Sequence, residues 1–333
     1  MTATATYQAL LNGYGIVDRS DRGRLAVSGP DRAKYLHNVT TNDVKKLAVG
    51  QGHEAFVTSL QGKTLGFVTL LAEESRILLR TDPNALAAFL PHLRKYGVFD
   101  EVEIDDISGE TYELHVLGSG AESALIHAGI EVPPAGEGSH VAATIGDARI
   151  LVVRESPTRL PGFTLIGPAA EASALISKLR DAGEGLVEVF DDVFEGLRIE
   201  AGTPLFGKDL TADNLPQELG RDSRAISFVK GCYLGQETVA RIDALGHVNK
   251  NLKGLRFVDT QEPAPAGSEI QIDGKKVGTI TSSTVSPSTG WPIALGYVRA
   301  THALEGTEVN VVSPSGNVAA VVLDLPMQLA ENA

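Results

Sequence analysis

The chain has 333 residues, a hydrophobic content of 43% and a formal net charge of -13, which is typical of a globular protein with two or three domains. It has no apolar run near the roughly 20 residues that span a bilayer, and its first six residues lack the basic start and apolar centre of an export signal. We therefore expect a cytoplasmic protein without membrane contact. The acidic charge argues against direct nucleic-acid binding, because such binding depends on neutralising phosphates.

The first 182 residues alternate between strand and helix patterns. Glu73-Glu74-Ser75 separates two strand-like segments and is a natural hairpin connection. Strands outnumber helices and hairpins recur, so the pattern predicts an α+β protein with antiparallel sheets. The strand-like segments are 15–18, 23–29, 53–60, 64–72, 76–80, 98–105, 111–117, 148–153 and 162–166, and the helical ones are 30–39, 84–96, 121–127 and 169–182.

Residues 187–200 form the clearest amphipathic helix. Apolar residues 189, 190, 193, 194 and 197 recur at helical spacing and are expected to pack inward, while Asp191, Asp192 and Glu195 face solvent. Gly202 is expected to end this helix, because glycine readily adopts the left-handed conformation at a helix C-terminus.

Cys232 is the only cysteine and lies in Lys230-Gly231-Cys232-Tyr233-Leu234-Gly235-Gln236-Glu237. A single cysteine excludes an intramolecular disulfide and fits a reducing compartment. Helical spacing after the motif places the thiol just before a helix, where the helix N-terminus and the lysine favour thiolate. Glu237 and Arg241 are four residues apart and can pair on that helix. The alternative is that Cys232 is a small buried hydrophobic residue.

We expect no metal site made by this chain alone. A zinc or iron-sulfur site normally takes about four ligands, and the eight histidines show no close ligand spacing. Any cluster that touched Cys232 would need ligands from another chain or from small thiols.

After residue 250 the pattern changes to short strands with almost no helix. Asp273-Gly274 is a typical hairpin turn between two of them. This pattern predicts a small C-terminal β-barrel over residues 251–333, following an α+β region over residues 1–250.

The cysteine motif, together with Val239-Ala240-Arg241, resembles the signature of the YgfZ family of folate-binding iron-sulfur assembly factors. That family is related to the glycine cleavage system T-protein, an aminomethyltransferase, and the resemblance covers nearly the whole chain. Further similar blocks are residues 23–47, 196–207 and 277–283.

The resemblance implies a cloverleaf of domains around a central channel that binds tetrahydrofolate or a one-carbon derivative. It also implies that the folate-binding region over residues 1–250 consists of two α+β subdomains, one inserted in the other. It implies that Glu200 recognises the pterin ring, whose N-H donors a carboxylate can accept in pairs. Arg198, Phe206 and Asn42 belong to the same blocks and are further candidates for folate contacts. In the cysteine motif it implies a reactive Cys232 with Lys230, supported by Gly231, Tyr233, Gly235, Gln236, Glu237 and Arg241.

The sequence departs from T-protein at the position of that enzyme's paired aspartates, where it has Gly66 and Phe67. Aminomethyl transfer needs an acid beside the reacting folate nitrogen, and neither residue can exchange a proton. Gln236 also replaces a residue that is commonly basic in T-protein.

Our leading hypothesis is a monomeric, tetrahydrofolate-binding accessory protein that supports assembly or repair of iron-sulfur enzymes, and through them tRNA modification, by means of Cys232. The rival is a folate-dependent one-carbon transferase that acts on an unknown amine or thiol. A third possibility is a scaffold in which Cys232 is structural.

Overall fold

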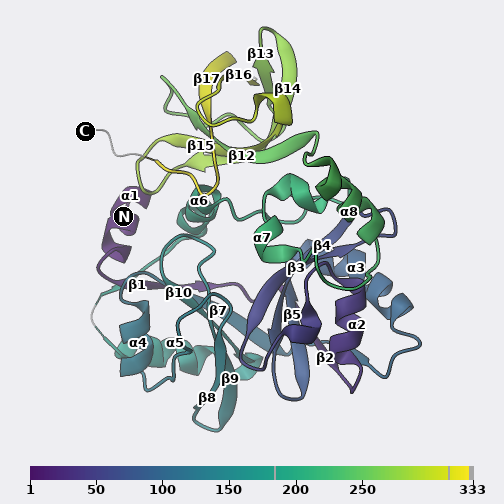
Figure 1. Cartoon of the computed structure of the whole chain (residues 1–333). Coiled ribbons are helices and arrows are strands. Elements are labelled where there is room, and N and C mark those ends of the chain that lie inside the picture. Colours follow the sequence, from purple (N-terminus) through teal and green to yellow (C-terminus); the bar gives the residue numbers. More distant parts are fainter. Residues whose placement is uncertain (184, 314–315, 330–333) are drawn as a thin grey trace.

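The computed structural model describes residues 1–183, 185–313 and 316–329. Two sheets lie side by side, and a closed barrel stands above them with helix α6 (Asp191–Ala201) beneath it (Figure 1). Helices α7 (Asp222–Ala225) and α8 (Gln236–Leu245) lie between the barrel and one of the sheets. The predicted α+β class with antiparallel sheets and a C-terminal barrel is confirmed.

The first sheet has five antiparallel strands in the order β3-β4-β5-β2-β6. Its other elements are helices α2 (Arg32–Val39) and α3 (Pro83–Tyr96), which pack with one face of the strands in a buried apolar cluster. The strands are β2 (Gly23–Ser28), β3 (Gly52–Thr58), β4 (Thr64–Ala72), β5 (Arg76–Thr81) and β6 (Glu103–Asp106).

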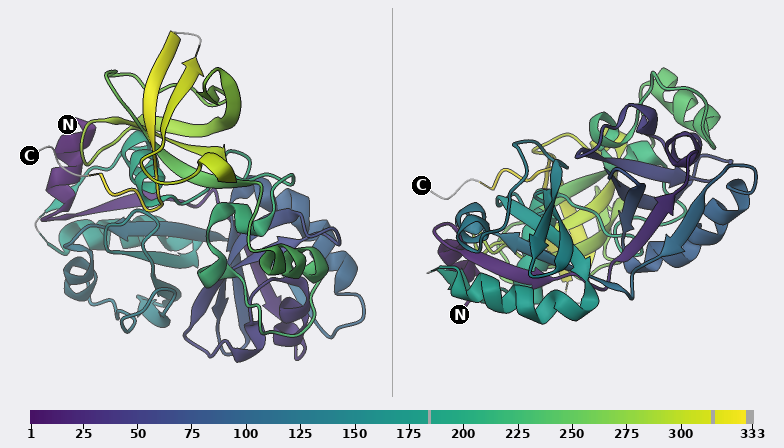
Figure 2. Two further views of the ribbon diagram at one scale, coloured as in Figure 1. Left: turned by 45° about the horizontal axis from the view of Figure 1, so that its top comes forward. Right: turned by 90° about the horizontal axis from the view of Figure 1, so that it is seen from below.

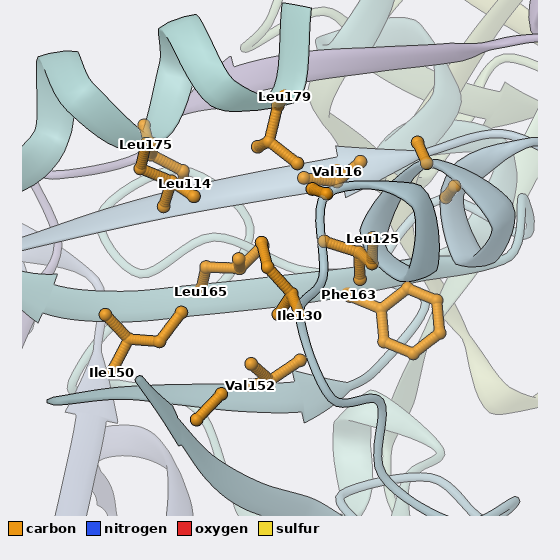
Figure 3. Packing of buried hydrophobic residues seen from close by; sticks show 14 of the residues in the cluster. Leu114, Val116, Leu125, Ile130, Ile150, Val152, Phe163, Leu165, Leu175 and Leu179 are labelled. Carbon is orange, nitrogen blue, oxygen red and sulfur yellow. The ribbon is translucent and has the colours of Figure 1, made fainter. Parts of the chain in front are cut away.

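The second sheet has six strands in the order β11-β1-β7-β10-β9-β8, of which only the β1–β11 pair is parallel within the described residues. In Figure 3, Leu175 and Leu179 of α5 and Leu125 of α4 pack onto this sheet, beside Leu114 and Leu165. The elements are β1 (Tyr14–Asp18), β7 (Thr111–Leu117), α4 (Ala121–His127), β8 (His140–Ile145), β9 (Ala148–Arg154), β10 (Gly162–Pro168), α5 (Ala172–Asp181) and β11 (Leu186–Val187).

The chain enters the second sheet before it builds the first. Strand β1 pairs with β7, yet β2 and the next four strands all belong to the other sheet. The uncovered faces of the two sheets then pack together through Leu71 and Leu78 on one side and Leu151, Val153 and Ile166 on the other. Figure 2 gives two further views of this arrangement.

The barrel closes in the order β12-β15-β14-β13-β16-β17, with antiparallel pairing throughout its described pairs. The predicted turn at Asp273-Gly274 is confirmed, and both residues have positive φ (49° and 72°), as the favoured two-residue hairpin turn requires. The strands are β12 (Lys250–Phe257), β13 (Glu269–Ile272), β14 (Lys275–Val285), β15 (Pro292–Arg299), β16 (Glu308–Ser313) and β17 (Gly316–Leu323).

Three local expectations differ from the structure. The strand expected over 98–105 begins at Glu103. The helix expected from residue 187 begins at Asp191, because Leu186–Val187 pairs with β1 instead, and Phe190 is 48% exposed and not packed inward. Strand β8 was not expected from the sequence and pairs at the sheet edge with β9.

The remaining helices are short. α1 (Ala3–Leu10) packs on α6 and the second sheet, and the 3-10 segments are Val44–Lys46, Ala169–Glu171, Pro216–Leu219 and Ala300–His302. Within the described part of the chain, no helix combines the length and the apolar character that a bilayer span requires.

Candidate functional site

A buried charge network joins the two sheets at their common interface. Arg80 of β5 donates to both oxygens of Glu113 of β7, at 2.6 and 3.1 Å, and to Glu155 at 2.8 Å. The side chains of Arg80 and Glu113 are fully buried. Burial alone would raise the pKa of Glu113, but Arg80 and Arg22 outweigh it and lower that pKa to about 2. These carboxylates therefore stay ionised, and their ion pairs with Arg80 hold the two sheets together.

A hollow of about 370 Å³, here called the α6 hollow, opens beside this network. Phe194 of α6 and Phe206 of the following loop give it two aromatic surfaces, and the Arg19 guanidinium lies 4.7 Å from the centre of the Phe194 ring. Further charged side chains on its wall are Asp18, Asp21, Arg22, Asp82, Asp191, Glu195, Arg198 and Lys208.

Two of the four predicted folate contacts, Arg198 and Phe206, line the α6 hollow. Arg198 is buried and already bonded, because its guanidinium donates to Glu195, to Asp209 at 2.5 Å and to Ser282 at 2.8 Å. It joins α6 to the barrel. The backbone N-H of Phe206 donates to Asp82 at 2.9 Å, which holds its ring beside the start of α3.

Glu200 lies elsewhere. Its side chain is buried between α6 and the barrel, where Oε1 accepts hydrogen bonds from the Ser286 hydroxyl (2.6 Å) and from the hydroxyl and backbone N-H of Ser288 (2.9 and 3.0 Å). It is not among the residues that line the α6 hollow. Oε1 of Glu200 therefore fastens the barrel to α6, and the contact of Glu200 with a pterin ring stays a prediction.

Asn42 also has a structural role. Its side-chain amide donates to the backbone carbonyls of Glu54 and Arg224, both at 2.8 Å, and ties β3 to α7. Glu54 and Arg224 line a second hollow of about 210 Å³, the acidic hollow, together with Glu137 and Glu155. Asn42 itself lines neither hollow, and its contact with a folate stays a prediction.

Gly66 and Phe67 of β4 point to opposite faces of the first sheet. A Cβ on Gly66 would lie 2.5 Å from a ring carbon of Phe89 in α3, so this face admits no side chain. Phe67 faces the other way, with its ring centre 5.2 Å from that of Phe56 and 5.4 Å from the guanidinium of Arg221. Neither face of β4 therefore has an acid at this point: the half-buried phenyl ring of Phe67 occupies one face, and Phe89 fills the space beside Gly66 on the other.

Cys232 lies in an exposed loop that is firmly anchored at both ends. Leu234 donates to the Asn38 carbonyl at 2.9 Å and accepts from the Thr58 hydroxyl at 2.5 Å. Gly235 has a φ of 81°, and a Cβ there would lie 2.3 Å from the Ser59 carbonyl oxygen, so only glycine fits. Helix α8 begins at the next residue, which confirms that the thiol precedes a helix start.

Lys230 is buried beneath this loop. Its ammonium donates to the backbone carbonyls of His37, Thr40 (2.6 Å) and Asn42 (2.8 Å), and it lies 4.8 Å from the centre of the Tyr233 ring. Burial lowers the pKa of Lys230 to about 7. The lysine therefore fixes the end of α2 to the motif, and its expected influence on the thiol stays a prediction.

The other motif residues have mixed positions. Tyr233 is buried and packs with Phe56 and Val239, whereas Gly231 is exposed. Gln236 is the first residue of α8. Glu237 and Arg241 are both exposed, and no ion pair joins them in the described residues, so the expected pairing is not found.

No sequence pattern singles out His37, which lies beside the motif. Its ring is buried, its Nδ1 lies 3.2 Å from an oxygen of Asp43, and its Nε2 lies 3.8 Å from where a Cβ of Gly231 would be. Burial and Lys230 lower the pKa of His37, so the ring is neutral near pH 7. A neutral imidazole can accept a proton, and this one lies beside Gly231, the residue before Cys232.

Cys232 does not line the α6 hollow or the acidic hollow, so the thiol and these two hollows are separate features of the molecule. Among the residues that the structure describes, no group of three His, Cys, Asp or Glu side chains is arranged to hold a metal ion.

Comparisons with known proteins agree over nearly the whole chain. The model of the GCVT N-terminal domain matches residues 2–230, and that of the glycine cleavage T-protein C-terminal barrel domain matches residues 250–328. The chain is 31% identical over 318 residues to a chloroplastic protein of Arabidopsis thaliana whose name describes a transferase, covering 95% of this chain and 71% of that protein.

It is also 30% identical over 315 residues to an aminomethyltransferase of Halalkalibacterium halodurans, covering 92% of this chain and 84% of that one. The crystal structure of the glycine cleavage system aminomethyltransferase T from Bartonella henselae superposes with a TM-score of 0.88 at 24% identity, covering 97% of this chain and 89% of that chain. At that identity the likeness establishes the fold alone.

Proposed function

Because this chain belongs to the glycine cleavage T-protein family, we propose that it binds a tetrahydrofolate in the α6 hollow and does not carry out aminomethyl transfer. The observation against aminomethyl transfer lies on β4, where the phenyl ring of Phe67 occupies one face of the sheet and Gly66 faces Phe89 on the other. A phenyl ring cannot exchange a proton with a reacting amine.

The α6 hollow fits the chemistry of a folate. Its volume of about 370 Å³ lies in the range of small-molecule sites. Phe194 and Phe206 offer faces for a flat ring, and the partly exposed carboxylate of Glu195 can accept N-H donors. Arg19 and Arg22 can pair with the carboxylates of the glutamate tail. When bound, such a carrier would supply a one-carbon unit.

Calorimetric titration with tetrahydrofolate tests the location. Phe194→Ala removes an aromatic wall of the α6 hollow, and we expect it to raise Kd at least about tenfold, which corresponds to a loss of about 1.4 kcal/mol. Phe190→Ala is the matched control, because Phe190 borders the same helix, is 48% exposed and does not line the hollow. Equal affinity of both variants and the wild type would place the folate elsewhere.

We further propose that the protein supports iron-sulfur enzymes, and through them tRNA modification, in the manner of the YgfZ family. The support is an exposed thiol on an anchored loop, with the neutral imidazole of His37 close by. An exposed thiol can reach a partner protein, whereas a buried one cannot.

Complementation of a deletion strain tests this role. We expect the wild-type gene to restore iron-sulfur enzyme activity and thiolated tRNA under oxidative stress, and Cys232→Ser to fail although it folds and binds folate normally. Full rescue by Cys232→Ser would contradict the proposal, and so would undiminished enzyme activity in the deletion strain.

The second candidate is a folate-dependent one-carbon transferase, which is favoured by similarity to proteins named aminomethyltransferase along more than nine-tenths of the chain. The two candidates differ in turnover. Incubation with methylene-tetrahydrofolate and candidate amines or thiols should consume no folate if our proposal holds, whereas steady consumption that Phe194→Ala abolishes would establish the transferase.

A further inference from the structure

A hollow of about 290 Å³ lies at the far end of α8 from the cysteine motif and is here called the α8 hollow. It is formed where α8 ends, where α7 begins and where the first barrel strand starts, a junction visible beside α7 and α8 in Figure 1. None of its lining residues belongs to the α6 hollow, so its chemistry is independent of the proposed folate site.

The wall of the α8 hollow presents hydrogen-bond acceptors that have no partner. Gln217 is 6% exposed, and its amide nitrogen donates to the Val239 carbonyl at 2.7 Å. That bond sets the orientation of the amide, so the atom left facing the hollow is the oxygen Oε1, which has no hydrogen-bond partner. One buried oxygen of Asp222, Oδ1, is also without a partner.

The hollow is also negative. Asp222 and Asp243 both line it, and neither forms an ion pair within the described residues. Helix α8 directs the negative end of its dipole here, and its last turn contains no basic residue. Burial, with the nearby charge of Asp243, raises the pKa of Asp222 to about 6, which reflects a carboxylate without a counter-ion.

The neighbouring cations are already engaged. Lys250 lies 3.6 Å from Glu218 and 4.5 Å from the centre of the Tyr297 ring. Arg221, which precedes α7, is bonded to both oxygens of Glu54. His247 is exposed at the rim of the hollow, with Nδ1 3.0 Å from the Leu245 carbonyl oxygen.

From these observations we propose that the α8 hollow is a binding site for a primary alkylammonium group. Such a group carries a positive charge and three N-H donors, which suit Gln217 Oε1, Asp222 Oδ1 and the carboxylate of Asp243. Water could satisfy one oxygen but would leave the negative charge uncompensated. The apolar side chains of Ile242, Val248 and Ala300 line the remaining wall and suit the alkyl part of the ligand.

A divalent metal ion suits the site less well. Such ions need several short, directed ligands, and no three His, Cys, Asp or Glu side chains in the described ranges are placed to supply them. An ammonium group accepts the longer and looser contacts that an amide and two carboxylates can make.

Titration of the full chain with n-propylammonium chloride at constant ionic strength tests the proposal, read by calorimetry and by the melting temperature. We expect saturable binding and a raised Tm. n-Propanol lacks the charge, and tetramethylammonium lacks the N-H donors, so we expect neither to bind. Equal responses to propylammonium and tetramethylammonium would mean unspecific screening and would overturn the proposal, as would saturable binding of K⁺ or Mg²⁺ in its place.

Variants locate the site. Asp222→Asn keeps the size of the side chain and removes its charge, and we expect it to raise the Kd for propylammonium at least about tenfold. Gln217→Leu should do the same by removing the buried acceptor, which a charge effect alone would not predict. Asp147→Asn, in an exposed turn of the second sheet, is the matched control. Unchanged binding in Asp222→Asn would overturn the assignment, and Phe194→Ala, which affects the α6 hollow, should leave it intact.

Discussion

Replacement of Lys230 by methionine tests how burial and hydrogen bonding balance beneath the cysteine motif. Lys230 is 7% exposed, and its ammonium donates to three backbone carbonyls. Burial lowers the pKa of Lys230 from 10.5 to about 7. Methionine has a similar length but neither the charge nor the donors. It therefore removes the cost of burying a charge and leaves three carbonyls without that donor.

The two effects are of similar size near neutral pH. The lowered pKa, 3.5 units below 10.5, corresponds to a burial cost of about 5 kcal/mol for the charged form. Loss of the hydrogen bonds costs on the order of 1–3 kcal/mol for each carbonyl left unsatisfied. The difference in the free energy of unfolding between the wild type and Lys230→Met at a single pH is thus a weak test. The change of that difference with pH is a strong one.

The direction of that change follows from proton binding. Between pH 7 and 10.5 the unfolded chain binds a proton at Lys230 that the folded protein does not, so raising the pH stabilises the wild type. The slope is about 1.4 kcal/mol per pH unit, which makes the wild type gain about 2 kcal/mol over Lys230→Met between about pH 7.5 and 9.

Urea denaturation of both proteins across this pH range measures the difference directly. Lys275→Met, at an exposed turn, is the matched control and should remain parallel to the wild type. A difference between wild type and Lys230→Met that does not vary with pH would refute the reasoning, because Lys230 would then keep its ordinary pKa while held by the three carbonyls.

Three further predictions concern stability at neutral pH, each measured by urea denaturation. Arg80→Met removes the hydrogen-bonded partner of the buried carboxylates of Glu113 and Glu155 and should cost about 3–5 kcal/mol; a loss below about 1 kcal/mol would mean that Arg22 and Arg24, 3.6 and 3.7 Å from Glu113, compensate for it. Gly66→Ala places a Cβ 2.5 Å from the Phe89 ring and should cost about 1–3 kcal/mol, and no loss would mean that α3 shifts freely. Cys232→Ser should change stability by less than about 0.5 kcal/mol, because the thiol is exposed, and should abolish modification by iodoacetamide; a larger loss would support a structural cysteine.

Where the sequence predicted well, the deciding interactions are local. Gly202 ends α6 in the left-handed conformation with φ of 69°, and Asp273-Gly274 closes its hairpin with two positive φ values. Side-chain periods of 2 and 3.6 residues indicate strands and helices, and residues that tolerate unusual backbone angles indicate turns. These signals lie within a few residues of the elements they specify.

The candidate site was predicted less completely, because its residues are defined by partners far away in the chain. One oxygen of Glu200 accepts hydrogen bonds from Ser288, which is 88 residues further along the chain. The ammonium of Lys230 donates to the carbonyl of His37, which is 193 residues away. His37 itself carried no local signal.

The sequence by itself therefore determined the α+β class, the barrel, the absence of an acid at residues 66 and 67, and a lone cysteine before a helix. Only the tertiary structure decided that Phe67 packs beside Phe56 and that the thiol is exposed and apart from the α6 hollow. The reason is physical: a side chain's type is encoded at its own position, whereas its solvent exposure, pKa and bonding partners depend on what the rest of the chain packs against it.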